Sequence, residues 1–144
     1  MIRRVAHEED YAALMGIWRR SVDATHHFID KAYLDELETL IPSFFPSVRL
    51  YKHCDGNRIW GFVGVAEGKI EMLFVDPEGM GRGIGRRLVE FAVSELGATQ
   101  VDVNEANAGA IAFYRKMGFA HNVGRSESDG MGRPYPTITL GLDQ

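Results

Sequence analysis

The chain has 144 residues, of which 45% are hydrophobic and 25% are charged, and its formal net charge is −4. These values are typical of one soluble globular domain and disfavour a disordered or fibrous chain. The mild negative charge argues against a nucleic-acid partner, because phosphate binding needs a concentrated basic face.

No apolar run reaches the roughly 20 residues that a membrane span requires, and no signal-peptide pattern is present. The single cysteine, Cys54, cannot form an internal disulfide, which favours a reducing compartment. We therefore predict one domain over residues 1–144, located in the cytoplasm and without a membrane partner.

The N-terminal half is predicted to contain a strand, two helices and a three-stranded meander. A strand over residues 2–5 precedes a helix from Glu8, in which Leu14, Trp18 and Val22 follow helical spacing. A second helix follows Asp30, a plausible N-cap, and ends near residues 42–46, where two prolines occur. Three antiparallel strands are predicted over residues 48–54, 59–66 and 70–75.

The C-terminal half alternates helices and strands. A glycine-rich segment leads into a predicted helix over residues 83–96, followed by a strand over 100–104 and a helix over 108–117. Two strands, over 119–128 and 135–142, flank a turn at Asp129-Gly130. This order predicts an α/β fold with a mixed sheet and excludes a regular βαβ repeat.

The glycine-rich segment has the composition of an anion site. Four glycines alternate with other residues between a strand and a helix, and three arginines lie close by: Gly79, Gly81, Gly83, Gly85, Arg82, Arg86 and Arg87. A helix N-terminus carries free amide groups and a partial positive charge, and glycines let a phosphate approach the backbone. A diphosphate therefore fits this loop.

Two common phosphate loops do not fit the pattern. A P-loop needs Gly-Lys followed by Ser or Thr, which is absent. A dinucleotide fingerprint needs a third glycine where the possible registers place Ile84, Arg86 or Leu88. A turn that only needs glycine flexibility, or an unrelated nucleotide site, remains an alternative.

Two motifs resemble those of the GNAT superfamily of N-acetyltransferases. The first is Val75-x-Pro77-x-x-x-Gly81-Arg82-Gly83-Ile84-Gly85-x-x-Leu88, which looks like the family's main coenzyme A motif. The second is Asn104-Glu105-x-Asn107-x-x-Ala110-x-x-Phe113-Tyr114-x-Lys116-x-Gly118-Phe119. With the element order, the resemblance covers essentially the whole chain. It implies a mostly antiparallel sheet, splayed between the fourth and fifth strands and flanked by about four helices.

The resemblance implies acetyl-CoA as co-substrate, with no metal. The pantetheine arm is expected between the splayed strands and the diphosphate at the glycine loop. The residues implied for the cofactor are Leu73, Phe74, Val75, Gly81, Arg82, Gly83, Ile84, Gly85, Arg86, Asn104, Asn107 and Tyr114. Met80 stands where the family usually has Gln or Arg, which predicts weaker cofactor binding.

Acyl transfer to an amine requires that the amine lose a proton and that the departing thiolate gain one. The resemblance makes Tyr114 the expected general acid; the alternative is a core aromatic residue. Strand alternation places Glu71 on the face of Leu73 and Val75, where it could relay the amine's proton. Its alternative is a solvated strand glutamate. We expect direct transfer in a ternary complex.

The acceptor pocket is expected at the first two helices, their junction and the last hairpin. The residues implied there are Trp18, His26, His27, Phe28 and Tyr135. No metal-ligand pattern accompanies the adjacent histidines. The acceptor is expected to be a small-molecule or peptide amine, and a homodimer is one option for the oligomeric state. A coenzyme A-binding sensor with little catalysis is the alternative function.

Overall fold

The computed structural model describes residues 1–5 and 7–142, and its elements follow the predicted order. The strands are β1 (Ile2–Arg4), β2 (Arg49–Asp55), β3 (Arg58–Ala66), β4 (Lys69–Val75), β5 (Gln100–Asn104), β6 (His121–Ser126) and β7 (Thr137–Gly141). The α-helices are α1 (His7–Thr25), α2 (Lys31–Leu40), α3 (Ile84–Leu96) and α4 (Ala108–Lys116). Two short 3₁₀ helices are η1 (Ile41–Ser47) and η2 (Pro77–Gly79). None of the helices in this part of the chain is long and apolar enough to cross a membrane.

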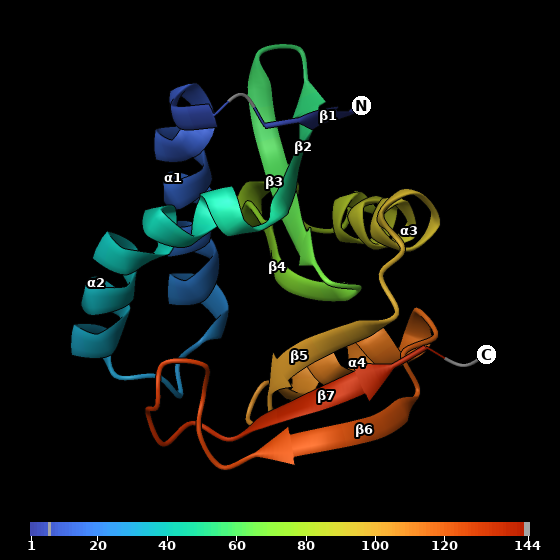
Figure 1. Ribbon diagram of the computed structural model, residues 1–144. Coiled ribbons are helices and arrows are strands. Elements are labelled where there is room, and N and C mark those ends of the chain that lie inside the picture. The colour runs from blue at the N-terminus through green and yellow to red at the C-terminus, as the bar shows by residue number, and fades with distance from the viewer. Residues whose placement is uncertain (6, 143–144) are drawn as a thin grey trace.

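Across the described residues the strands form one sheet in the order β1-β2-β3-β4-β5-β7-β6. Every neighbouring pair is antiparallel except β4 and β5, which are parallel. These two strands pair only at Lys69–Gln100 and Ile70–Val101, and then diverge (Figure 1). The predicted mixed sheet, split between its fourth and fifth strands, is thereby confirmed.

Helices cover both faces of the sheet (Figure 1). On one side, Leu14 and Ile17 of α1 pack with Phe62 of β3. On the other side, Leu88 of α3 belongs to a second apolar cluster, which extends to Leu140 of β7. These side chains are at most 1% exposed, so the two clusters together hold the helices against the sheet.

The second helix ends at Leu40, slightly before the predicted end near residues 42–46. The chain then continues as the 3₁₀ helix η1 through Pro46, which was not predicted. Phe45 anchors this segment, because it is 1% exposed and its ring contacts those of Tyr11 and Phe62, with centroids 4.8 and 6.1 Å away. A prediction from proline alone misses this, because proline is compatible with the first turn of a helix and burial then decides.

The last two strands are shorter than predicted. Phe119 is fully buried and its amide donates to the carbonyl of Tyr114, so it closes α4 instead of starting β6. Asp129 shapes the β6–β7 connection, because its Oδ1 accepts from the amides of Met131 and Arg133, both at 2.9 Å. Such side-chain bonds replace the strand ladder across residues 127–136.

A buried carboxylate ends β4. The side chain of Asp76 is 1% exposed and accepts from Arg20 at 2.9 Å, the Glu78 amide at 3.1 Å and Arg58 at 3.4 Å. Burial alone raises the pKa of Asp76, but these hydrogen bonds outweigh it and the pKa is lowered overall. Asp76 therefore joins α1, β3 and the glycine loop as an ionised group.

Asp76→Asn should lower the free energy of unfolding at pH 7 by about 2 kcal/mol, because charge-assisted hydrogen bonds are lost. The lowered native pKa means that the unfolded state binds protons first as the pH falls. The wild-type contribution is therefore complete above about pH 5, begins to decline near pH 4 and is lost as the pH falls through the lowered native pKa. Urea unfolding at pH 7 and through pH 3–5 would measure both effects. The control Asp55→Asn, at an exposed position, should show neither the loss of stability nor the change in its pH dependence. If Asp76→Asn left the free energy of unfolding unchanged, the role of Asp76 would be contradicted.

Candidate active site

The glycine loop reaches the start of α3 through two left-handed residues, Gly81 (φ +80°) and Gly83 (φ +75°). A Cβ added at Gly81 would meet no heavy atom within 4 Å, so the requirement for glycine is conformational and not steric. Gly83 is the N-cap, and its carbonyl accepts from the Arg87 amide at 3.0 Å. The preceding amides, of residues 84–86, have no partner within the helix and can donate to an anion.

A cleft of about 570 Å³ opens where β4 and β5 diverge. It is lined by most of the predicted site residues: His26, Glu71, Leu73, Phe74, Val75, Gly81, Gly83, Ile84, Gly85, Arg86, Asn104, Asn107 and Tyr114. The split sheet, the start of α3 and the face of α4 thus meet around one continuous space.

One edge of β4 is free inside this cleft. The Asp76 amide donates to the Trp60 carbonyl of β3 at 2.8 Å. Every second residue of a strand directs its amide and carbonyl to the same side, so Phe74 also directs these groups toward β3. Leu73 and Val75 therefore direct their amides and carbonyls toward the gap. Within residues 1–5 and 7–142 no strand pairs with this edge beyond Ile70. An extended ligand can hydrogen-bond to such an edge as an added strand.

Tyr114 lies at the boundary between the core and the cleft. It is 7% exposed, and its ring contacts Phe113 and Phe119 at centroid distances of 5.2 and 6.0 Å. No hydrogen bond ties its hydroxyl to another described residue. Burial raises the pKa of Tyr114 above its ordinary value, so it is protonated at neutral pH. The residue is at once a core aromatic and a donor facing the cleft.

Glu71 occupies a bulge in β4. Ile70 pairs with Val65 and Met72 pairs with Gly64, so Glu71 is the extra residue. The bulge breaks the alternation: Ile70, Leu73 and Val75 pack on the α3 side, but Met72 and Phe74 pack on the α1 side. Alternation therefore does not fix the side of the sheet on which Glu71 lies, and a face shared with Leu73 and Val75 stays a prediction.

The charged neighbours of Glu71 are Lys69, Asp102 and Glu67. Burial raises the pKa of Glu71; Asp102 and Glu67 raise it further, and Lys69 opposes them. Asp102 also lines the cleft and is held by Lys69 at 3.2 Å. In the β4–β5 register, Glu71 and Asp102 follow the last paired residues, so both carboxylates stand where the strands part. Asp102 was not predicted as a site residue, although it alternates with Val101 and Val103, which are buried.

Both predicted asparagines lie in the cleft and also shape the backbone. The Asn107 Oδ1 caps α4 by accepting from the Ala110 amide at 3.1 Å. The Asn104 Oδ1 accepts from the Ala106 amide at 3.0 Å. Since each side-chain oxygen is engaged, the amide NH₂ groups are the atoms that could contact a ligand.

Five predicted residues do not line the cleft: Trp18, His27, Phe28, Arg82 and Tyr135. Trp18 is 3% exposed in the α1 core, which supports its alternative structural interpretation. The Arg82 guanidinium lies over the Trp60 ring, 4.7 Å from its centroid, beside the glycine loop. Contacts of these residues with a ligand remain predictions.

His26 is the predicted acceptor-side residue that reaches the cleft, together with Ser21 and Thr25 of α1. Its Nδ1 lies 2.7 Å from the Thr25 Oγ1. Burial, and then the neighbouring His27, lower the pKa of His26. The ring is therefore neutral at pH 7 and presents a polar but uncharged surface.

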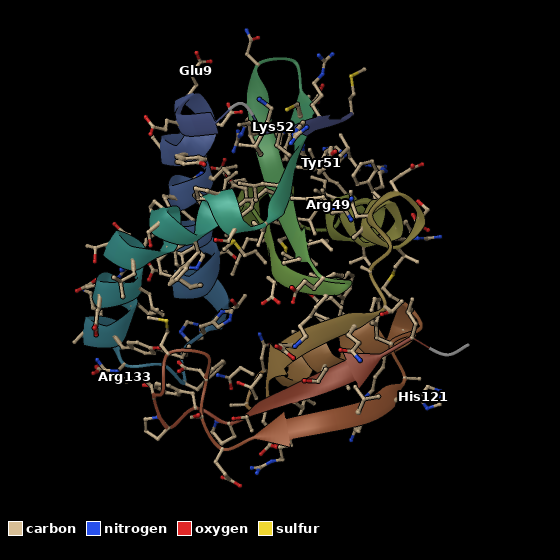
Figure 2. All side chains as sticks on the ribbon, viewed as in Figure 1. Glu9, Arg49, Tyr51, Lys52, His121 and Arg133 are labelled. Atoms are coloured by element: carbon tan, nitrogen blue, oxygen red, sulfur yellow. The ribbon has the colours of Figure 1, made fainter. Side chains whose placement is uncertain are left out.

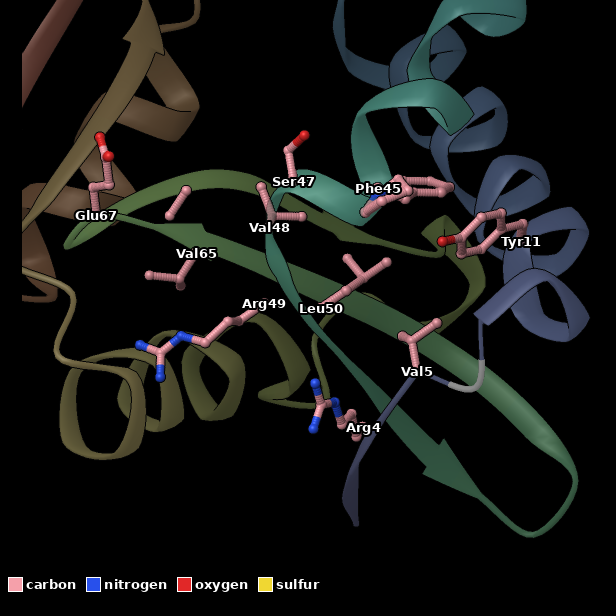
Figure 3. A pocket seen from close by; sticks show the side chains of 12 residues that line it. Arg4, Val5, Tyr11, Phe45, Ser47, Val48, Arg49, Leu50, Val65 and Glu67 are labelled. Carbon is pink, nitrogen blue, oxygen red and sulfur yellow. The ribbon is translucent and has the colours of Figure 1, made fainter.

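A second hollow, of about 480 Å³, lies between η1, β2 and the end of β3 (Figure 3). Val5, Val48 and Leu50 form an apolar floor, and Arg4 and Glu67 stand at its rim. Its volume approaches that of the cleft, so size does not distinguish them. The free strand edge, the helix start and the titratable cluster all belong to the cleft, which is therefore the candidate active site.

Comparisons with known proteins agree with this geometry. Residues 46–121 match the family model described as an acetyltransferase (GNAT) domain. The chain is 45% identical over 140 residues to the peptidyl-lysine N-acetyltransferase YjaB of Salmonella typhimurium, covering 96% of this chain and 95% of the relative.

Solved structures show the same arrangement. The solution structure of apo-form YjaB from Escherichia coli superposes with a TM-score of 0.88 at 42% identity, over 99% of this chain and 96% of that one. The PaiA N-acetyltransferase of Thermoplasma acidophilum, in complex with coenzyme A, has the same fold at 18% identity and a TM-score of 0.71. That likeness covers 99% of this chain and 98% of the other.

The match to the family model spans more than half of the chain, and the similarity to YjaB spans nearly all of it. These findings favour the enzyme over the coenzyme A-binding sensor. The chain belongs to the GNAT family and is an N-acetyltransferase.

Proposed function

We propose that residues 1–144 act as one domain that transfers an acetyl group from acetyl-CoA directly to a primary amine, in a ternary complex. The observation that carries this proposal is the free edge of β4 beside the start of α3. The strand edge can hold an extended amide-bearing arm, and the helix start can hold a diphosphate.

The residues that fit coenzyme A follow from this geometry. The amides of residues 84–86 would hold the diphosphate, with Arg86 nearby, and Leu73 and Val75 would bond the pantetheine amides. Acetyl-CoA supplies an activated acetyl thioester. Met80, which stands where the family usually has Gln or Arg, is 62% exposed at the cleft. The absence of a polar side chain there affects the rim of the cofactor site more than the backbone amides that would bind the diphosphate.

Proton transfer assigns roles to three side chains. A carboxylate of Glu71 or Asp102 takes the ammonium proton, directly or through water. The amine nitrogen then attacks the acetyl carbon, and the Tyr114 hydroxyl donates its proton to the sulfur as the carbon–sulfur bond breaks. The excess proton on the nitrogen passes, directly or through water, to the Tyr114 phenolate, which leaves the neutral amide and restores the hydroxyl. With ordinary pKa values near 10 and 8.5 the proton transfer to sulfur would be uphill by about 2 kcal/mol. Burial raises the pKa of Tyr114 and so adds to this cost. The return of the nitrogen proton to Tyr114 offsets it over the whole reaction.

Direct transfer is supported by the position of Cys54. This residue lies on β2, and no cysteine lines the cleft among the described residues. The cleft therefore offers no cysteine thiol that could take the acetyl group from coenzyme A. The amine itself is the expected nucleophile.

For the acceptor we propose the side chain of a peptidyl lysine, in a cytoplasmic protein or peptide. Two similar proteins carry the name peptidyl-lysine N-acetyltransferase. In this chain, Glu71 and Asp102 stand where β4 and β5 part, and an ammonium group complements that negative charge.

The test combines purified protein, acetyl-CoA and lysine-containing peptides. Release of free thiol should accompany a mass increase of one acetyl group on the peptide, and the product should need both substrates together. Binding of acetyl-CoA without turnover on any amine would reject catalysis. Absence of binding at millimolar concentration would reject the cofactor assignment as well.

The pH profile should identify the carboxylate pair. Because the pKa of Glu71 is raised, the acid limb of kcat/KM should lie above that of an ordinary glutamate. Asp102→Asn removes a negative neighbour and releases Lys69, so the limb should move to lower pH. The control Asp35→Asn, on α2, should leave it in place. An unmoved limb in Asp102→Asn would remove this pair from the proton path.

A further inference from the structure

A clasp of side chains joins α2 to the loop between β6 and β7. We define the clasp as Tyr33, Glu36, Asp129, Arg133 and Tyr135. The Tyr33 hydroxyl donates to the Asp129 Oδ2, and the rings of Tyr33 and Tyr135 stack with centroids 5.5 Å apart and planes 3° apart. Arg133 pairs with Glu36 at 2.6 Å and lies over the Tyr33 ring. Figures 1 and 2 show this loop, with Arg133, beside the start of α2.

The clasp connects the two walls of the cleft. On one side, the Asp30 amide donates to the Tyr135 hydroxyl at 3.1 Å, and Asp30 follows the turn that carries His26. On the other side, Thr137 pairs with Asn104 of the cleft, two residues after Tyr135. A short chain of contacts thus links the α1 wall to the β5 wall.

This connection is remote from the other junction between the halves of the sheet. In the described strands the β4–β5 ladder consists of Lys69–Gln100 and Ile70–Val101, beside which Lys69 pairs with Asp102. The other end of the cleft, where β4 and β5 have diverged, is therefore held by the side chains of the clasp. The distance between the two walls of the cleft at that end depends on these contacts.

The inner part of the clasp is buried and hydrogen-bonded. Tyr33 is 4% exposed, and burial, followed by its bond to Asp129, raises its pKa. Its hydroxyl therefore remains a donor in the alkaline range in which amines lose their protons. The side chains of Arg133 and Glu36 are each about half exposed, so their ion pair adds little to the stability of the clasp.

We propose that the clasp sets the width of the acceptor-side opening and thereby selects amines on unbranched chains over amines with a substituent beside the nitrogen. The inference rests on the proposed function. A wall that cannot move excludes the wider substrate by steric repulsion, whereas a loosened wall admits both. Tyr33 and Tyr135 are positioning residues in this scheme, because they act through the walls.

The test uses two peptides that differ by one methyl group on the ε-carbon of the lysine. Wild-type enzyme should favour the unbranched peptide by at least about tenfold in kcat/KM, in the range that one methylene can discriminate. Tyr33→Phe removes one hydroxyl and keeps the ring, and it should lower this ratio at least threefold. The Kd for acetyl-CoA should change by less than twofold.

Tyr51→Phe is the matched control. Tyr51 lies on β2 against Phe91, with ring centroids 4.9 Å apart, and it does not line the cleft (Figure 2). Loss of the Tyr51 hydroxyl should leave the ratio of kcat/KM for the two peptides unchanged. Tyr135→Leu is the second variant, because it removes the stacking and the Asp30 contact but leaves Tyr33 bonded to Asp129. It should lower the ratio as well.

The outcomes separate the two proposals. Wild-type enzyme that acetylates both peptides equally well, or clasp variants that slow both peptides by the same factor, would overturn the clasp alone. Wild-type enzyme that acetylates neither peptide would overturn the proposed acceptor, and the clasp proposal with it. A lowered ratio in both clasp variants, with the control unchanged, supports selection by the clasp.

Discussion

Tyr114→Phe is expected to lower kcat by about 100-fold or more, in the range typical of a lost general acid. The Kd for acetyl-CoA should stay within twofold, because the ring that packs against Phe113 and Phe119 is retained. Only the hydroxyl, which bonds to no other described residue, is removed. Steady-state kinetics with saturating peptide, together with calorimetric titration of acetyl-CoA, would measure the two quantities separately.

Tyr11→Phe supplies the comparison for this variant. Tyr11 also packs against an aromatic ring, that of Phe45, but it does not line the cleft. Its turnover should match the wild type. If Tyr114→Phe retained turnover within threefold, the acid role would be lost and the packing role would remain.

Gly83→Val is expected to weaken binding of coenzyme A by about 100-fold, the equivalent of one or two charge-assisted hydrogen bonds. Valine strongly disfavours the φ of +75° that aims the amides of residues 84–86 at the cleft. The helix start should rotate away from the diphosphate as the backbone relaxes. Isothermal titration with coenzyme A would measure the loss.

Gly97→Val separates ligand binding from backbone strain. Gly97 caps the other end of α3 in nearly the same conformation, φ +70°, with no heavy atom within 4 Å of an added Cβ. Both variants should lose stability by about 1–2 kcal/mol or more. Only Gly83→Val should lose affinity, and equal affinity in the two variants would contradict the diphosphate assignment.

Local patterns predicted most of the architecture. Helical spacing in residues 8–22, the turn chemistry between the meander strands and the glycine loop are set by neighbours in the chain. The same holds for Asn107, because a capping residue acts on amides three positions away. Such features were visible in the sequence since few residues determine them.

Features that depend on distant contacts were not visible. The bulge at Glu71 arises from the pairing of β4 with Val65 and Gly64, and it interrupts the alternation from which the face of Glu71 was predicted. Tyr33 and Asp129 are 96 positions apart, and neither belongs to a motif. Asp102 resembles an ordinary outward strand residue until β4 and β5 are placed side by side. No periodicity in one segment can report such encounters.

The sparse pairing between β4 and β5 also bears on how the molecule melts. Without a ligand, the β4–β5 ladder ends after two residue pairs, although the apolar cluster around Leu88 packs across the split. A pantetheine arm bonded to the free edge of β4 would add hydrogen bonds along that edge. Because such a ligand binds the folded sheet and not the unfolded chain, the cofactor would raise the melting temperature as well as supply the acetyl group.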